Sequence, residues 1–547
     1  MLTIEESPSR MKATMSLIHP RHPRQVLIAL AVLALPGVVA LGMLIARIQA
    51  VIEPSGGLLA TSGGEPISIY NVFKLQRGMK LYEDPREPPF YASTLYNAGF
   101  YHSYAAVGRM FFDGLHPPVT ALRLFTLALG CAGLAGLLAY VLVLVRRAPE
   151  LSFPVIRAIG MLLTGVAVVL GALPGWWLLT VRPDVGAAAF ATLALLITLL
   201  IGPGRDGRAG LLAGLCLAAA WSFKQSTVFL LIGLLISALL NRRYRYAFAM
   251  MIPLVLTGVA FIALLGPEYR FNAFFATSLS QFELRNLASM AIRVPLKGAF
   301  PLVAAIAALV TLPRMSWMRR DEAVCLKTCW WTCLSGAVVT CCRGGSEVNY
   351  FFEFWVVVGF LAVNEAGWLI ESAGKFPARL SPALLALSVV AISSSGLDAM
   401  RIASPGRLGT VRLKPGEDRL RELKRAQVLA EAETGVVCCQ PALWGLGWDL
   451  PVPAYVFDDY PYFQEPAERR GLLRGGGLPG LLAARHFRLM ILETDNLPFI
   501  NAATAAGYLR ELGWSHLAIM RPGDELERVT SRERSPHPPE DRGRLTR

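Results

Sequence analysis

The stretch VLIALAVLALPGVVALGMLIA, residues 26–46, decides the fold class of this chain. It carries no charged residue and is long enough to cross the hydrocarbon core of a bilayer as one helix, which takes about 20 apolar residues. The whole chain of 547 residues is 54% hydrophobic and only 17% charged, whereas a soluble domain has roughly 25% charged residues. This composition excludes a soluble, disordered or fibrous protein, and nine cysteines exclude a disulfide scaffold. We therefore expect a polytopic membrane protein.

Charge-free apolar runs of this kind recur along the chain and predict eleven transmembrane helices. In chain order the runs are Val26–Ala46, Leu124–Val145, Ala158–Val181, Val185–Gly204, Ala209–Phe223, Ser226–Asn241, Tyr246–Pro267, Gly298–Pro313, Thr328–Cys342, Phe354–Asn364 and Leu380–Leu397. The fifth and sixth runs could also form one long helix. The basic residues further along the chain fit the positive-inside rule only if these two runs are separate spans.

The basic residues predict which way the chain is inserted. The first run is longer than the roughly 7–15 apolar residues of a signal peptide, and no small-residue cleavage site follows it, so it is interpreted as a signal anchor. If residues 1–25 are cytoplasmic, every short inner connection is basic. These connections hold Arg146, Arg147 and Arg157; Arg205 and Arg208; Arg242, Arg243 and Arg245; Arg314, Arg319 and Arg320; and Lys375 and Arg379. We therefore expect a multi-pass protein of the cytoplasmic (inner) membrane with two longer outer loops, about 47–120 and 267–297.

Beyond about Met400 the sequence changes character. Polar and apolar residues alternate as in a small soluble domain, and eleven spans place this part on the extracytoplasmic side. The expected strands are Val436–Gln440, Phe487–Leu492 and His516–Met520, and the expected helices are Leu478–Ala484 and Asn501–Leu512. The predicted fold class is an all-α polytopic membrane domain of about eleven transmembrane helices with a small α/β extracytoplasmic C-terminal domain. Its predicted parts are a cytoplasmic segment 1–25, a membrane domain 26–400, an outer domain 401–521 and a disordered tail 522–547 rich in Arg, Glu and Pro.

Polar and charged residues gather at the outer ends of the expected spans. Ionisable groups at the membrane are costly to bury and are therefore functional candidates. They form four groups: Glu65, Glu83, Asp84 and Glu87 in the first outer loop; Arg182-Pro183-Asp184 between the third and fourth spans; Lys224-Gln225 between the fifth and sixth; and Arg343, Glu347, Asn349, Tyr350 and Glu353 after the ninth. Because apolar runs alone define the spans, the location of all four groups on one face predicts a single site.

Each group also has a purely structural interpretation. The sequence Arg182-Pro183-Asp184 suits the stop of one helix and the capped start of the next. Lys224 can extend its ammonium group to the lipid headgroups without binding a ligand. Arg343 can anchor a span at the interface, and single acids in a long loop are usually solvated. All of these interpretations would have to coincide on one face, so we favour the single site.

Other motifs indicate no metal or nucleotide chemistry. Cys325, Cys329 and Cys333 share one helix face, whereas zinc ligands usually come from turns, so we expect these cysteines to pack helices and hold no metal. The chain has no P-loop, dinucleotide-binding glycine motif, GxSxG or HExxH. We therefore expect no nucleotide cofactor, and the sequence leaves the need for a divalent cation undecided.

The first outer loop resembles that of the bacterial C-type (GT-C) glycosyltransferases. The similar residues are Gly64-Glu65-Pro66, the run Gly78-Met79-Lys80-Leu81-Tyr82-Glu83-Asp84-Pro85, Tyr96-Asn97 and Phe100-Tyr101. The segments Arg182-Pro183-Asp184, Phe223-Lys224-Gln225 and Glu347 to Glu353 also resemble motifs of one branch of this superfamily. The superfamily includes the protein mannosyltransferases (glycosyltransferase family 39), the aminoarabinose transferase of lipid A and the rhizobial lipopolysaccharide galacturonosyltransferases.

The resemblance implies a hexosyl- or pentosyltransferase. It would take a sugar from a polyprenyl-phosphate donor on the outer face of the membrane and pass it to a lipid, glycan or protein acceptor. Its catalytic base would be an acid of the first outer loop. Many relatives have an Asp, often in an Asp-Glu pair, near the end of the first span; here Glu65 is the nearest match and Asp84 the second candidate. We expect Glu65 to be the base, because a Gly-Gly-Glu-Pro turn can hold a carboxylate near the outer end of that span.

The chemistry of such a transfer assigns roles to the other residues. The acceptor hydroxyl loses its proton to a carboxylate as it attacks the anomeric carbon. The leaving phosphate is already anionic and needs cations rather than a strong acid. The candidates for these cations are Lys224, Arg182 and Arg343. The expected substrate pocket contains Asp184, Gln225, Glu347, Asn349, Tyr350, Tyr82 and Tyr96, with the tyrosines as surfaces on which a sugar stacks.

Two other functions remain as alternatives. Interrupted spans and charges near the membrane also suit a transporter of a lipid-linked or anionic substrate. Against it, the charges lie at one face rather than near the midplane, and no internal repeat is visible. A scaffold whose outer domain binds a partner leaves the clustered acids and bases unexplained. No nucleic-acid partner is expected, because the basic residues lie between apolar runs.

Overall fold

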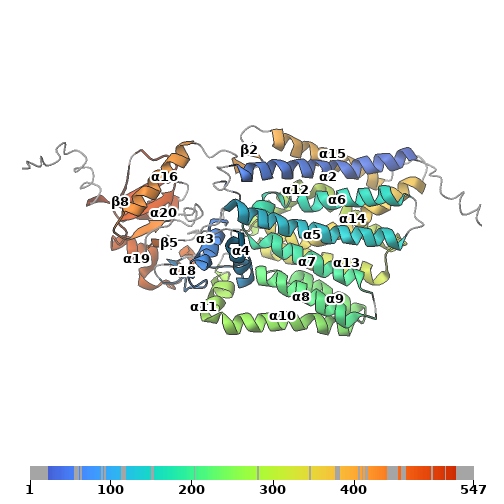
Figure 1. Cartoon of the computed structure of the whole chain (residues 1–547), viewed down its shortest axis with the longest axis horizontal. Helices are drawn as coiled ribbons and strands as arrows, with labels where there is room; N and C mark the ends of the chain where they lie inside the picture. The colour runs from blue at the N-terminus through green and yellow to red at the C-terminus, as the bar shows by residue number, and fades with distance from the viewer. Residues whose placement is uncertain are drawn as a thin grey trace, which may run out of the picture.

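The computed structural model shows an elongated molecule with a helical bundle at one end and a mixed α/β layer at the other (Figure 1). The described residues are 23–53, 59, 61, 65–87, 90–91, 94–111, 119–148, 153–202, 204–276, 278–279, 282–343, 346–375, 382–403, 407–408, 411–412, 417–439, 454–457, 464–494, 497–511 and 513–524. Two short segments of the first outer loop, α3 (Glu65–Gln76) and α4 (Ala98–Phe111), lie between the bundle and the α/β layer (Figure 1).

The bundle is built from long apolar helices. They are α2 (Pro23–Ile52), α5 (Val119–Arg147), α6 (Pro154–Leu170), α7 (Pro183–Leu200), α8 (Asp206–Phe223), α9 (Phe229–Leu240), α10 (Tyr244–Leu264), α12 (Leu284–Thr311), α13 (Arg320–Cys341), α14 (Phe352–Lys375) and α15 (Pro382–Ala403). Each expected span overlaps one of these helices. Seven helices among the described residues are long and apolar enough to cross a membrane, and three more apolar stretches are shorter. The chain is therefore a multi-pass membrane protein, while the count of eleven spans stays a prediction.

Several expected boundaries are wrong: α13 begins at Arg320 rather than Thr328, and α14 continues to Lys375 rather than Asn364. Two further errors have a local cause. The third span ends at Leu170 rather than Val181, because Gly171 leaves the helix in an extended conformation and a separate 3₁₀ turn, η3, covers Gly175–Leu179. The eighth helix begins at Leu284 rather than Gly298, and Gly298 is instead a kink with non-helical backbone angles between Pro295 and Pro301. A proline inside a helix removes a backbone hydrogen bond and bends the helix. The charge-free apolar run begins at this kink, so the apolar pattern alone predicted that the helix would start there.

Burial separates a central helix from peripheral ones. The most apolar window of α14 is 89% buried, whereas that of α10 is only 11% buried and faces outward. Glycines allow the closest helix contacts. A Cβ atom on Gly210 or Gly214 of α8 would lie 2.3 Å from a backbone oxygen of α10, at Tyr246 and Met250 respectively. This is the small-residue spacing that lets membrane helices pack backbone to backbone.

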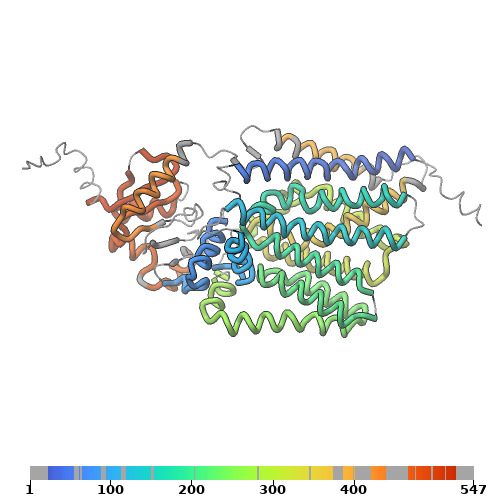
Figure 2. Tube along the Cα trace, in the orientation of Figure 1, coloured from blue at the N-terminus to red at the C-terminus, as the bar shows by residue number. Residues whose placement is uncertain are grey.

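The helix ends sort into two faces of the bundle. At one face Arg147 pairs with Glu322 at 2.6 Å, and Arg243 pairs with Asp206 at 2.7 Å. These pairs join the end of α5 to the start of α13, and the start of α10 to the start of α8. At the opposite face lie the start of α7, the end of α8 and the start of α14, together with α3 and α4 (Figure 2). The basic end and the motif-bearing end are therefore opposite ends, as the sequence predicts.

The α/β layer contains a six-stranded sheet in the order β1-β5-β4-β6-β8-β7. The strands are β1 (Phe90–Tyr91), β4 (Val437–Cys439), β5 (Ala454–Phe457), β6 (Leu489–Glu493), β7 (Tyr508–Arg510) and β8 (Leu517–Pro522). The β1–β5, β5–β4 and β4–β6 pairs are parallel, and β6–β8 and β8–β7 are antiparallel. The flanking helices are α16 (Glu417–Ala432), α18 (Gln464–Arg469), α19 (Gly477–Ala483) and α20 (Leu497–Ala505). The sheet is therefore completed by a strand of the first outer loop, which the sequence did not predict.

The expected elements of the C-terminal part are mostly confirmed. The three expected strands coincide with β4, β6 and β8, and one expected helix coincides with α19. The second, Asn501–Leu512, is wrong beyond Ala505, because Gly507 adopts φ +85° and the chain turns into β7. A left-handed backbone conformation of this kind is typical of glycine after a helix. The expected cytoplasmic segment before residue 23 and most of the expected tail, 525–547, lie outside the described residues.

Reporter fusions test the orientation of the two faces. Fusions at Arg146, Arg205, Arg242 and Lys375 should report the cytoplasm, because short basic connections stay on that side. Fusions at Asp184, Lys224, Asn349 and Gly447 should report the outer side; Gly447 lies outside the described residues. A cytoplasmic signal at Gly447, with the other seven as expected, would place the α/β layer on the wrong side of the membrane and contradict the eleven-span topology.

Candidate active site

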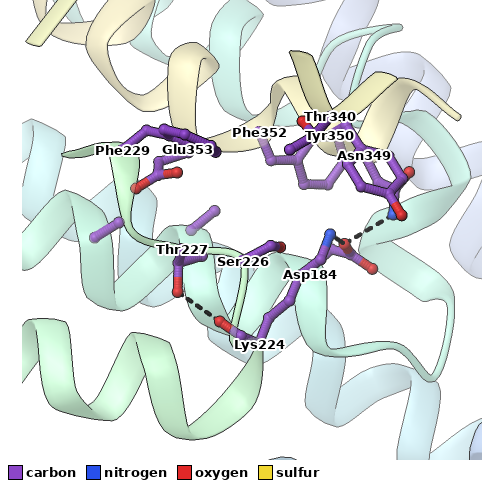
Figure 3. A pocket seen from close by; sticks show the side chains of 12 residues that line it. Asp184, Lys224, Ser226, Thr227, Phe229, Thr340, Asn349, Tyr350, Phe352 and Glu353 are labelled. Atoms are coloured by element: carbon purple, nitrogen blue, oxygen red, sulfur yellow. Dashed lines mark hydrogen bonds and ion pairs between the residues drawn. The ribbon is translucent and has the colours of Figure 1, made fainter. Parts of the chain in front are cut away.

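Three of the predicted motifs meet at one small cavity at the motif-bearing end of the bundle (Figure 3). The cavity has a volume of about 20 Å³ and lies among the starts of α7, α9 and α14. Its lining residues are Asp184, Ala188, Ala191, Lys224, Ser226, Thr227, Phe229, Thr340, Asn349, Tyr350, Phe352 and Glu353. The structure thus brings together residues that are far apart in the chain, such as Asp184 and Asn349, which are 165 positions apart.

Local sequence explains how each polar side chain reaches the cavity. Pro183 occupies the first turn of α7, where its missing N–H is not needed, and Asp184 follows in the same turn. Lys224 is the C-cap of α8, where the helix stops before the turn to α9. Asn349 and Tyr350 lie on a short 3₁₀ helix, η6 (Val348–Phe351), that leads directly into α14. The motifs are therefore helix ends that face one another.

Asp184 is the centre of the polar contacts. Its Oδ1 accepts hydrogen bonds from Lys224 Nζ at 2.5 Å and from Asn349 Nδ2 at 2.9 Å, as Figure 3 shows. Arg182 Nε lies 3.5 Å from the other oxygen, Oδ2. The ammonium group of Lys224 also lies 4.7 Å from the centre of the Tyr350 ring. One buried carboxylate thus holds two cations beside the cavity.

Arg182 is enclosed by aromatic rings. Its guanidinium lies 4.8 Å from the Trp177 ring centre and 5.6 Å from that of Tyr96, and it donates a hydrogen bond to the Tyr96 hydroxyl. Burial lowers the pKa of Arg182, but the neighbouring Tyr96, Asp184 and Glu347 outweigh burial and raise the pKa above its ordinary value. Burial raises the pKa of Tyr96. Arg182 therefore remains a cation, and Tyr96 remains a neutral hydroxyl.

The first outer loop forms one wall beside Arg182. The hydroxyl of Tyr82 donates to the carbonyl oxygen of Tyr96 at 2.7 Å, so two expected pocket tyrosines are in contact. Gln225 turns toward this wall rather than into the cavity, since its amide donates to the carbonyl oxygens of Leu95 and Ala273. Gln225 therefore fixes the loop to the end of α8.

Glu65, the expected base, lies one layer behind the cavity. It begins α3, and its side chain is 3% exposed. Its two oxygens accept hydrogen bonds from Arg123 Nε at 2.9 Å and Arg123 Nη2 at 2.7 Å. Oε1 also accepts the backbone N–H of Val181 at 2.8 Å. Since Val181 precedes Arg182, Glu65 holds the turn that presents Arg182 and Asp184.

Asp84 has a more open environment. Its side chain is 18% exposed and accepts hydrogen bonds from the backbone and side chain of Arg86. Partial burial raises the pKa of Asp84, but the hydrogen bonds from Arg86 outweigh this effect and hold the pKa below its ordinary value. Its neighbour Glu83 pairs with the buried Lys74 at 2.5 Å. Asp84 is therefore an ionised carboxylate at neutral pH.

Two further candidates lie away from the cavity lining. Arg343 follows α13 with an exposed side chain, and its backbone pairs with that of Phe282. Glu347 is half-buried as the N-cap of η6 and acts on Arg182 electrostatically. The predicted spans put both residues at the correct end of the bundle, so an error in the spans does not explain why they lie away from the cavity. The distance of each from the cavity depends on the bend of the turn between α13 and η6, which a hydropathy pattern does not encode.

Sequence reasoning missed Arg123, and it placed Glu353 in the fourth polar group without giving it a role. Arg123 is a lone charge just before an apolar run, a signal that could have marked it as a partner for a loop acid. Glu353 lines the cavity, and its Oε1 accepts the backbone N–H of Leu230 at 2.6 Å, so it caps the start of α9. Across the described residues, no three His, Cys, Asp or Glu side chains are grouped so that they could hold a metal ion.

Substitution of one member of the buried Glu65–Arg123 pair should destabilise the protein strongly. Breaking a buried pair leaves an uncompensated charge and typically costs about 3–5 kcal/mol. The variant Glu65→Ala should therefore lower the Tm of the purified protein in detergent by several degrees. The control is Lys80→Ala, which breaks an exposed pair with Glu268 at 3.2 Å and should cost at most about 1 kcal/mol. Equal Tm values for the two variants would contradict a structural role for the buried pair.

Comparison with known proteins rests on structure rather than sequence. No family model matches the chain, and no curated protein matches it in sequence. The apo crystal structure of ArnT from Cupriavidus metallidurans is similar with a TM-score of 0.56 at 11% identity, covering 89% of this chain and 98% of ArnT. ArnT bound to undecaprenyl phosphate is similar with a TM-score of 0.53 at 11% identity, covering 88% of this chain and 97% of ArnT.

The structure of an archaeal protein is also similar to this chain. The oligosaccharyltransferase AglB from Archaeoglobus fulgidus, in complex with an inhibitory peptide and a dolichol-phosphate, has a TM-score of 0.52 at 10% identity. The match covers 90% of this chain and 74% of AglB. Both similarities cover most of this chain, 89% for apo ArnT and 90% for AglB. This chain therefore has the fold of the GT-C membrane glycosyltransferases.

Proposed function

We propose that this protein is an integral-membrane glycosyltransferase. It transfers a sugar from a polyprenyl-phosphate-linked donor to a lipid, glycan or protein acceptor on the outer face of the cytoplasmic membrane. The observation that carries the proposal is the pair of cations, Lys224 and Arg182, held by one buried carboxylate at the end of an apolar bundle. A phosphate at the end of a lipid chain needs this combination of a charged cavity and an apolar surround. The residues 26–400 form the proposed catalytic domain, and 401–521 form the proposed outer domain.

The proposed donor site places the phosphate against Lys224 and Arg182. In the transfer, the acceptor oxygen forms a bond to the anomeric carbon while the bond from that carbon to the phosphate oxygen breaks. The negative charge that remains on the phosphate is stabilised by cations that are already in place. Asn349 and Tyr350 support these groups from η6. Asn349 donates a hydrogen bond to Asp184, and the ring of Tyr350 faces the Lys224 ammonium group.

We assign the base to Asp84 and a positioning role to Glu65. The Glu65 carboxylate is enclosed, and it already accepts two hydrogen bonds from the Arg123 guanidinium, one from the Val181 N–H and one from the Thr61 hydroxyl. Asp84 is ionised and partly exposed. It lies two residues after Tyr82, which contacts Tyr96 beside Arg182. This arrangement supports Asp84 as the group that accepts the acceptor's proton, and it reverses the expectation from sequence.

Lys224→Ala tests the donor site. Loss of a charge-assisted contact to phosphate should weaken binding of undecaprenyl phosphate to the purified protein by about tenfold or more. The matched comparison is Arg343→Ala, because Arg343 was predicted for the same role but is exposed. Its effect should be smaller than that of Lys224→Ala. Unchanged binding of undecaprenyl phosphate to Lys224→Ala would overturn the proposed donor site. The similarity of fold would stand, but Lys224 would not be a phosphate-binding residue.

The base is tested by pH dependence. Asp84→Asn should lower the rate of transfer by about 10²-fold or more while donor binding persists. Because the pKa of Asp84 is depressed, the wild type should keep its base ionised into mildly acidic pH and lose activity only below that range. Glu65→Gln should lower the rate of transfer but should lose activity over the same acidic pH range as the wild type. The reason is that Glu65 acts only by positioning Val181 and Arg182. An active Asp84→Asn with an inactive Glu65→Gln would restore Glu65 as the base.

A further inference from the structure

A short π-helix contacts the loop segment that carries the proposed base. This helix, η4 (Phe271–Ala276), lies between α10 and α12 in the chain. Helices of this kind are rare and are frequently found at functional sites. The ring of its first residue, Phe271, contacts Arg86. The amide of its second residue, Asn272, contacts Glu83, which directly precedes the proposed base. The proposed function does not use either contact.

Asn272 fixes the backbone beside Asp84. The residue is fully buried, and its Nδ2 donates to the carbonyl oxygens of Glu83 at 2.8 Å and Glu268 at 2.9 Å. Its Oδ1 accepts the backbone N–H of Thr94 at 2.8 Å. A shift of the loop would break these bonds and leave buried polar groups unpaired, which is costly. The amide therefore holds the loop backbone in one position.

Arg86 orients the side chain of Asp84. Asp84 Oδ1 accepts hydrogen bonds from the backbone N–H of Arg86 at 3.0 Å and from its Nε at 2.7 Å. Asp84 Oδ2 accepts one hydrogen bond, from Nη2 of Arg86 at 2.6 Å. Each oxygen of a carboxylate has about two acceptor positions. These bonds fill both positions on Oδ1, so Oδ2 is the oxygen that can accept a substrate proton.

Two parts of the molecule fix Arg86 in turn. Its guanidinium carbon lies 4.3 Å from the centre of the Phe271 ring, and a planar guanidinium stacks well on an aromatic face. From the outer domain, the backbone N–H of Arg474 donates to the carbonyl oxygen of Arg86 at 2.8 Å, and the Arg474 side chain pairs with Glu87. Phe271 also packs in one apolar cluster with Ala467 of α18. Both η4 and the outer domain therefore hold Arg86.

The other charged groups around Asp84 are paired with one another. The pairs are Lys74 with Glu83, Lys80 with Glu268, and Arg474 with Glu87. Among the described residues, Arg86 is thus the cation that bonds Asp84 directly. Partial burial raises the pKa of Asp84, and the hydrogen bonds from Arg86, with a smaller effect of Arg474, hold the pKa below its ordinary value.

We propose that Arg86 is a positioning residue that holds Asp84 with its Oδ2 open to the acceptor hydroxyl, and that η4 and the outer domain hold Arg86 in place. The inference rests on the proposed function, because it takes Asp84 as the base. In the step, the acceptor oxygen bonds to the anomeric carbon, and the bond from that carbon to the phosphate oxygen breaks. The proton of the acceptor passes to Oδ2. The outer domain thus acts on the transfer through Arg86 without supplying the base.

The protonation of Asp84 tests the contact without any sugar. Infrared difference spectra of the full-length protein in detergent, each taken against the matching Asp84→Asn variant, isolate the Asp84 carboxyl band for titration with pH. Arg86→Ala should raise the pKa of Asp84 by about one unit or more, since an adjacent arginine lowers a carboxyl pKa by about 1–3 units. Phe271→Leu should raise this pKa less, because Arg86 remains but loses its stacking surface.

The pH dependence of transfer tests the positioning role. Native membranes supply the donor and the acceptor, and the pH is varied at the outer face. Arg86→Ala should lower the rate by about tenfold or more and should lose activity at higher pH than the wild type, because the base is protonated at higher pH. In the Asp84→Asn background the same change should have little further effect, since Arg86 acts through Asp84. Binding of undecaprenyl phosphate should be unchanged.

The matched control is Arg270→Ala. Arg270 is exposed and directly precedes Phe271, so its removal should leave both the pKa of Asp84 and the rate as in the wild type. An unchanged pKa and rate in Arg86→Ala, with Asp84→Asn inactive, would overturn this proposal and leave the base assignment standing. An equal loss from Arg86→Ala with and without Asp84 would also overturn it, because the effect would then be on the fold. A fully active Asp84→Asn would overturn the base assignment and this inference with it.

Discussion

A carboxylate buried at the end of an apolar bundle must be neutralised, and Asp184 imposes that requirement on the whole outer end. Asp184 is 2% exposed, and an uncompensated charge in such surroundings costs several kcal/mol. Lys224 comes from the end of α8, Arg182 from the turn before α7 and Asn349 from η6. Three helix ends are therefore held together by one group. The cations are therefore held in place by the protein itself.

The first outer loop is a folded layer that supports this cluster. Glu65 holds Val181, Gln225 holds the backbone at Leu95, and the Asn97 amide donates to the backbone oxygen of Trp221. Each contact joins the loop to the end of a bundle helix. The positions of the helix ends therefore fix the loop, and with it Tyr82 and Tyr96. These two tyrosines form one wall of the site beside Arg182. A solvated loop of this length could not do so.

Sequence reasoning predicted the parts of the fold that depend on apolar length and charge. The expected spans overlap helices because a long charge-free run has few alternatives to a helix in a membrane. The joining of Asp184, Lys224 and Asn349 follows from the same reasoning, since alternate spans return the chain to one face. Other features depend on packing. The pairing of Glu65 with Arg123 requires α3 to lie against α5, and the break after Leu170 requires Gly171 to leave the helix. Neither is visible in hydropathy, and the side to which Arg343 turns is not visible either.

The edge strand β1 links distant parts of the chain during synthesis. It lies in the first outer loop but pairs with β5, and nearby Arg474 pairs with Glu87, 387 positions earlier. The loop emerges first, while its sheet partners are made only after the last bundle helix. The backbone groups of its two strand residues therefore stay unpaired with β5 until the bundle helices and β5 have been synthesised. Since insertion delivers both segments to the same compartment, the bundle shortens the search between them. A chain truncated anywhere in the bundle would lack β5 and would leave β1 without its partner strand.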